Sequence, residues 1–168
     1  MGEYASVSEI PDWRLALLDG ATRLPVAVQA RNPIGWPGYV PRQAVSVWRL
    51  RSGAVAAAWD FSAFGGSFGE DDAAALQQAV HEAVRGRAPL LTLVRSGGTR
   101  LQEGMAALIG IPRARLALLD LAAAGLPHVS VPWGRCGPPS RSPHRGVRVA
   151  GPAPGAVVEP APVLVAAR

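Results

Sequence analysis

Short apolar runs alternate with amphipathic stretches through the middle of the chain, a pattern that predicts an α/β fold. Residues 44–50 and 54–59 are two apolar runs separated by Arg51-Ser52-Gly53, which predicts a β-hairpin. Residues 73–84 repeat apolar positions with helical spacing, and the three acidic residues before them favour a helix N-terminus. Residues 90–95 form the next short apolar run, which predicts a buried strand.

The segment after this strand predicts two more helices and a further strand. A helix is expected from Arg100 to Pro112, because proline cannot donate a hydrogen bond in a helix interior. A second helix is expected over residues 113–124, followed by a strand over residues 128–131. This order predicts a ββα spiral. No G-x-G-x-x-G motif follows a strand, so a dinucleotide-binding fold is not expected.

A glycine pair lies between the predicted strand 90–95 and the helix after it. In Ser96-Gly97-Gly98-Thr99-Arg100-Leu101-Gln102-Glu103-Gly104-Met105, the strand–turn–helix order is expected to present free backbone N–H groups at a helix N-terminus. The missing Cβ atoms let a substrate oxygen approach these amides closely, as in an oxyanion hole. A Gly-Gly turn without any chemical role is the alternative reading of the same residues.

Two glycine blocks in the same order resemble a known enzyme family. The stretch Ser96–Met105 resembles the glycine-rich motif of biotin-dependent carboxyltransferase subunits, the acyl-CoA carboxylase class. Asp60-Phe61-Ser62-Ala63-Phe64-Gly65-Gly66-Ser67-Phe68-Gly69 is similar to that family's preceding glycine block. The resemblance covers roughly residues 30–131 and implies a crotonase-like fold, as a single incomplete domain.

The resemblance also implies a chemistry and a set of site residues. Carboxybiotin would hand its carboxyl group to the α-carbon of acetyl-CoA or a related acyl-CoA, giving malonyl-CoA or an analogue for fatty acid biosynthesis. Gly97 and Gly98 would be catalytic, holding the thioester carbonyl while negative charge develops on its oxygen. The substrate-binding residues would be Gly65, Gly66, Ser96, Thr99 and Arg100. For Arg100 the sequence favours a second role over contact with a substrate phosphate, namely fixing the helix start together with Glu103 through side-chain hydrogen bonds.

The family's second, homologous domain has no counterpart in this sequence. A complete site would therefore need a second carboxyltransferase subunit or domain, together with a biotin carboxyl carrier protein, biotin carboxylase and an oligomeric assembly. Biotin would be held by the partner carrier, and the acyl-CoA would be the substrate. Two alternatives stay open, namely a CoA-thioester decarboxylase subunit and a non-catalytic truncated remnant.

Composition excludes several other classes of protein. All seventeen basic residues are arginine, and the net charge of +5 is concentrated after Val131, where five arginines face Glu159 alone. A basic patch on the fold is therefore not expected, and neither is nucleic-acid binding. The single cysteine, Cys136, excludes a multi-cysteine zinc site, so no metal is predicted. No apolar run is long enough for a membrane span and the N-terminus does not fit a secretory signal, so a cytoplasmic protein is expected.

Three regions follow from these patterns: an N-terminal extension over residues 1–30, a partial carboxyltransferase domain over 31–131 and a tail over 132–168. The tail contains eight of the sixteen prolines and no amphipathic period, which is typical of disordered or poorly packed chain. We expect it to add nothing to the fold. A change of reading frame in a GC-rich gene and a genuine flexible tail both explain its composition.

Overall fold

The computed structural model describes residues 12–27, 29, 31–132 and 148–150. Its elements, in chain order, are α1 (Asp12–Leu18), β1 (Thr22–Leu24), β2 (Val45–Arg49), β3 (Val55–Trp59), η1 (Phe64–Gly66), α2 (Glu70–Arg85), β4 (Leu90–Val94), η2 (Leu101–Glu103), α3 (Met105–Ala123), β5 (His128–Pro132) and β6 (Arg148–Ala150). The strands lie in one mixed sheet with the spatial order β1-β2-β3-β4-β5-β6, so strands that follow one another in the sequence are neighbours in space.

The direction of the strands follows from their connections. A tight turn joins β2 to β3, and the two strands pair antiparallel with Val47 opposite Ala57, which confirms the predicted hairpin. Helices α2 and α3 connect β3 to β4 and β4 to β5, and these three strands are parallel. The chain therefore advances by one strand with each helical crossover, which confirms the predicted α/β spiral.

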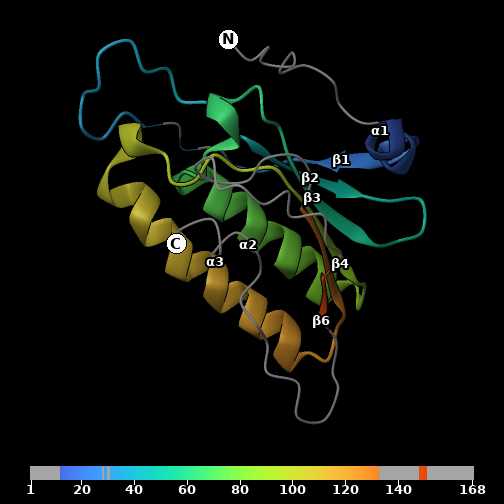
Figure 1. The fold of residues 1–168 in the computed structure, drawn as a ribbon. Helices are drawn as coiled ribbons and strands as arrows, with labels where there is room; N and C mark the ends of the chain where they lie inside the picture. The colour runs from blue at the N-terminus through green and yellow to red at the C-terminus, as the bar shows by residue number, and fades with distance from the viewer. Residues whose placement is uncertain (1–11, 28, 30, 133–147, 151–168) are drawn as a thin grey trace.

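The core lies between the sheet and the two long helices. Helix α2 packs on the sheet and α3 packs along α2 on the same side (Figure 1). Val47, Val55 and Leu76 are fully buried in this cluster, and the Trp59 ring stacks on Phe68 with a centroid distance of 6.2 Å. Burial of a large aliphatic side chain is worth about 1.5–3 kcal/mol, so this cluster accounts for most of the apolar driving force.

Helix α3 differs from the prediction of two helices separated at Pro112. It is continuous from Met105 to Ala123, with Pro112 inside it. Proline removes the hydrogen bond to the carbonyl of Leu108, but both residues are exposed, so water can bind that oxygen. The buried side of the helix, including Ala114 and Leu121, keeps its packing and holds the helix together across the proline.

Short segments of the predicted N-terminal extension and of the predicted tail contribute strands to the sheet. Thr22–Leu24, within the predicted N-terminal extension, pairs antiparallel with β2. Pro132 ends β5 and Arg148–Ala150 pairs with β5, so the expectation that residues 132–168 add nothing to the fold fails for these residues. The rest of the predicted tail, residues 133–147 and 151–168, lies outside the described residues.

Candidate functional site

The two glycine blocks form adjacent turns at one edge of the sheet. The first turn, residues 60–69, follows β3 and contains η1, while the second turn, residues 95–104, follows β4 and contains η2. Because β3 and β4 are parallel neighbours, their carboxyl ends meet at the same edge and the turns lie together. Sequence order and sheet topology thus place the two blocks in contact.

Three backbone hydrogen bonds join the turns. The Gly97 N–H donates to the Gly65 carbonyl at 2.9 Å, and the Phe68 N–H donates to the Gly98 carbonyl at 2.7 Å. The Arg100 N–H donates to the Phe68 carbonyl at 2.9 Å, which completes a short parallel bridge. The structure therefore brings the two glycine pairs into direct contact.

Glycine is required where the turns touch. At Gly66, with φ of +65°, a Cβ atom would lie 2.1 Å from the Arg95 carbonyl oxygen, a distance that no side chain can adopt. At Gly97, a Cβ atom would lie 2.8 Å from the Gly65 carbonyl oxygen. Gly98 is different, because its φ is +103° and no atom lies within 4 Å of its Cβ position. Gly98 therefore faces open space.

The backbone amides differ from the expectation of two free N–H groups at a helix start. The Gly97 N–H is bonded to Gly65, and the Gly98 N–H donates to the Ser96 hydroxyl at 3.2 Å. The helix begins at Met105 rather than near Arg100, because the 3₁₀ turn η2 and Gly104, with φ of +56°, come first. The Thr99 N–H points away from Phe68, since residues 98 and 100 make the bonds of the parallel bridge.

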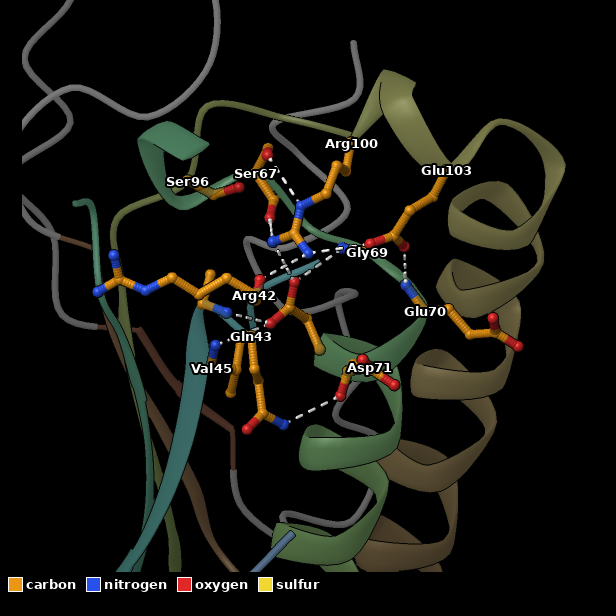
Figure 2. A network of polar contacts seen from close by, with 12 residues as sticks. Arg42, Gln43, Val45, Ser67, Gly69, Glu70, Asp71, Ser96, Arg100 and Glu103 are labelled. Carbon is orange, nitrogen blue, oxygen red and sulfur yellow. Dashed lines mark hydrogen bonds and ion pairs between the residues drawn. The ribbon is translucent and has the colours of Figure 1, made fainter. Parts of the chain in front are cut away.

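A buried ion-pair network lies directly beneath the two turns (Figure 2). The Arg100 side chain is 1% exposed, and its guanidinium contacts Asp72 at 2.6 Å and Glu103 at 3.1 Å. It also donates to the Ser67 hydroxyl and carbonyl and to the Arg42 carbonyl. All parts of this planar cation are thus bound by the protein, as a buried charge requires.

Asp72 connects the network to the start of α2 and to β2. Its carboxylate accepts hydrogen bonds from the N–H groups of Ala44, Val45 and Gly69 at 2.6, 2.8 and 2.9 Å. Burial raises the pKa of Asp72, while Arg100 and these three N–H groups oppose the shift. For Arg100, attraction to Asp72 and Glu103 outweighs burial and raises the pKa.

Glu103 connects the same network to the loop between β1 and β2. The Tyr39 hydroxyl donates to one Glu103 oxygen at 2.5 Å, and the Glu70 N–H at the start of α2 donates to the other at 2.6 Å. Burial and the Glu103 carboxylate raise the pKa of Tyr39 to about 12, so its hydroxyl stays protonated at neutral pH. The Tyr39 ring lies 5.2 Å from Phe64, the residue before the first glycine pair.

The carboxyl transferase domain profile matches residues 52–137, the stretch that contains both glycine turns together with Asp72, Arg100 and Glu103 of the network. This chain belongs to the carboxyl transferase domain family. It is 40% identical over 77 residues to the acetyl-coenzyme A carboxylase carboxyl transferase subunit beta of Brucella canis, covering 46% of this chain and 26% of that protein. The subunit beta of Dinoroseobacter shibae is 42% identical over 81 residues, with 48% and 25% covered. The chain thus spans about a quarter of these curated relatives.

Solved structures agree with this assignment. Transcarboxylase 12S, determined with methylmalonyl-coenzyme A and methylmalonic acid bound, matches 70% of this chain and 24% of its own chain with a TM-score of 0.60 and 26% identity. A Pseudomonas malonate decarboxylase hetero-tetramer in complex with malonate matches 65% and 43%, with a TM-score of 0.56 and 31% identity. These neighbours show that the domain has the expected crotonase-like fold.

The site of this carboxyl transferase domain corresponds only in part to the residues predicted from sequence. Gly65, Gly66, Gly97 and Gly98 come together, and Thr99 lies beside them half-buried. Ser96 is buried and accepts the Gly98 N–H, so its hydroxyl supports the turn. Direct contact between Arg100 and a substrate does not fit the burial of its guanidinium. The second predicted role was wrong about the helix, because Arg100 and Glu103 contact the start of α2 and α3 begins at Met105 without a side-chain cap.

Four residues of the network were not anticipated: Tyr39, Phe64, Ser67 and Asp72. Asp72 lies at the third position of α2 and bonds back to the Gly69 N–H, an acidic capping pattern that sequence inspection can find. Tyr39 is 64 residues from Glu103 and carries no local signal. Among the described residues, no cluster of metal-ligating side chains exists, and none of the helices could span a bilayer.

Proposed function

We propose that this domain binds an acyl-CoA thioester at the second glycine turn and supports carboxyl transfer to its α-carbon. One observation carries the proposal, namely the open side of Gly98 at a turn that hydrogen bonds hold against the first glycine block. A thioester carbonyl can approach there without meeting a side chain. The relatives' names, acetyl-coenzyme A carboxylase carboxyl transferase subunit beta, support acetyl-CoA as substrate and malonyl-CoA as product.

The chain's contribution is to stabilise negative charge on the thioester oxygen. Removing a proton from the α-carbon moves electron density onto this oxygen, and neutral backbone donors stabilise it without reorganising. The geometry favours the Thr99 N–H as the first donor, because the Gly97 N–H is bonded to Gly65. The Gly98 N–H serves as a second donor once the thioester oxygen replaces its 3.2 Å bond to the Ser96 hydroxyl. One preorganised donor is typically worth about 3 kcal/mol. Carboxybiotin, carried by another protein, would supply the carboxyl group.

The remaining machinery belongs to partners in this proposal. A complementary carboxyltransferase subunit or domain would form the biotin side of the site, and a biotin carboxyl carrier protein with biotin carboxylase would deliver the carboxyl group in the cytoplasm. The relatives' names, which call each of them a subunit, support an assembly of several chains.

A second candidate function is decarboxylation of a malonyl thioester, since a malonate decarboxylase matches at 31% identity. The same oxyanion stabilisation serves loss of CO₂. A non-catalytic remnant is the third reading, and aggregation or an unfolded circular dichroism spectrum of the purified chain would favour it.

Binding and turnover with malonyl-CoA distinguish these readings. Isothermal titration calorimetry of the folded chain with acetyl-CoA should show binding that free CoA, which lacks the thioester carbonyl, reproduces only weakly. With a complementary subunit present, acetyl-CoA should form from malonyl-CoA only when a biotinyl carrier is added. Release of CO₂ without biotin would contradict carboxyl transfer and support the decarboxylase.

A further inference from the structure

Arg100 is a residue of the second glycine turn, and both its backbone N–H and its side chain bind the first turn. Its N–H donates to the Phe68 carbonyl at 2.9 Å, while its guanidinium binds the hydroxyl and carbonyl of Ser67. All three acceptors belong to Ser67 and Phe68, the two residues that directly follow Gly65-Gly66 in the first turn. A shift of either turn would therefore break contacts made by this one residue.

The space around the ion pair leaves no freedom for the end of the first turn. A Cβ atom on Gly69 would lie 2.4 Å from a Glu103 oxygen and 2.8 Å from an Arg100 nitrogen. The backbone of the first turn thus rests directly on the buried charges, as Figure 2 shows for Gly69, Arg100 and Glu103. Since packed interiors do not deform continuously, the position of Arg100 and Glu103 fixes that of Gly69.

Phe64 gives a second line of evidence, because its backbone is strained. Its φ is +50°, a conformation that bulky residues adopt rarely, and the residue directly precedes the first glycine pair. The Phe64 ring packs against Tyr39 at 5.2 Å and under the Arg100 guanidinium at 5.0 Å. Strain of this kind persists only where surrounding contacts hold it.

We propose that Arg100, Glu103 and Tyr39 are positioning residues that hold the two glycine turns in the geometry needed to bind a substrate carbonyl. None of the three touches the substrate. Arg100 acts through Ser67 and the Phe68 carbonyl, Glu103 acts through Arg100 and the start of α2, and Tyr39 acts through Glu103 and Phe64. This inference rests on the proposed function for its catalytic consequence, whereas the holding of the turns does not depend on it.

Amide hydrogen exchange, read by NMR on the full chain, tests the holding of the turns. In Arg100→Lys the charge stays but the planar fork is lost, and in Tyr39→Phe only one hydroxyl is removed. Both variants should lose protection at the Gly97 and Phe68 amides, which bond across the turns, by at least about tenfold. Arg49→Lys is the matched control, because Arg49 forms a partly exposed pair with Glu82 at 2.8 Å, and it should leave these amides within about twofold of wild type.

Turnover tests the catalytic consequence in the assembly with a complementary subunit and biotinyl carrier. A misplacement of about 1 Å can cost about 10²-fold in rate, so Tyr39→Phe should lower kcat by on the order of tenfold while KM for acetyl-CoA stays within about twofold. Arg100→Lys should lower kcat further.

Each outcome decides one of the two claims. Unchanged protection of Gly97 and Phe68 in Tyr39→Phe, which removes only a hydroxyl and should fold, would overturn the positioning role. Equal loss of protection across β2 and β3 would overturn it too, because it indicates a general loss of stability. The wild-type assembly could instead show slow amide hydrogen exchange at Gly97 and Phe68 and yet transfer no carboxyl group. That result would refute the proposed function and leave the positioning of the turns established.

Discussion

Replacing Gly98 by alanine separates a chemical role of the second glycine turn from a purely structural one. With φ of +103°, Gly98 adopts a conformation that L residues disfavour, but no atom lies within 4 Å of the added methyl group. The cost to folding is therefore backbone strain alone, about 1–3 kcal/mol. The methyl group would occupy the space in which we place the thioester carbonyl.

Gly125→Ala provides a control with the same kind of strain at a distance from the turns. Gly125 follows the C-terminus of α3, has φ of +68° and also has open space at its Cβ position. Urea denaturation should show both variants to be less stable than wild type by about 1–3 kcal/mol. Only Gly98→Ala should lose function, because only its methyl group keeps an oxygen from the amides of Gly98 and Thr99.

The expected loss of turnover follows from the donors that the carbonyl can no longer reach. Each oxyanion donor contributes about 10²–10³ in rate, so Gly98→Ala should reduce formation of malonyl-CoA from acetyl-CoA at least about 100-fold. Gly98→Val, with a β-branched side chain, should abolish it. His81→Ala, at an exposed position on α2, should leave the rate unchanged. If Gly98→Ala retains full turnover and affinity while losing stability like Gly125→Ala, the substrate does not bind at this turn.

Three further predictions concern stability. Arg100→Met should lower the free energy of unfolding by about 3–5 kcal/mol in chemical denaturation, because it leaves the buried Asp72 and Glu103 without a cation; a loss under 1 kcal/mol would contradict a buried ion pair. Burial lowers the pKa of His128 from 6.5 to about 4, so the unfolded chain binds a proton at a higher pH than the folded chain does. The free energy of unfolding should therefore fall by roughly 3 kcal/mol as the pH drops from 6.5 to 4. His128→Asn should flatten this pH dependence, and an unchanged dependence would show that another group causes it. Pro112→Ala should raise the melting temperature, because alanine restores the missing hydrogen bond in α3 at an exposed position, and a lower melting temperature would show that the proline is needed.

Local signals were sufficient for most of the fold. The hairpin between β2 and β3 and the acidic start of α2 were predicted from residues that are neighbours in sequence. Pro112 misled the prediction of α3, because a local rule was overridden by packing of the helix's buried side on α2. β1 has only three residues and exists through its pairing with β2, so its own sequence carries little information.

The candidate site was predictable only at its glycines. Two ordered glycine blocks showed which turns matter, but the hydrogen bond that occupies the Gly97 N–H is made by Gly65, a residue of the other block. Two partners of Arg100 are also distant in sequence, with Asp72 28 residues away and Arg42 58 residues away. Such contacts depend on where the helices and strands are placed in space, which no short window of sequence records.

The contact between α2 and α3 makes the position of the first glycine turn depend on residues outside both turns. A Cβ atom on Gly110 would lie 2.9 Å from the Ala73 Cβ and 3.5 Å from the Gly69 carbonyl oxygen, so α3 touches α2 just where the first turn ends. A larger residue at position 110 would push the helices apart and carry Gly69 with them. In a saturation mutagenesis screen scored by turnover, Gly110 should therefore tolerate as few substitutions as a residue of the site itself, although it lies a full turn inside a helix and contacts no substrate.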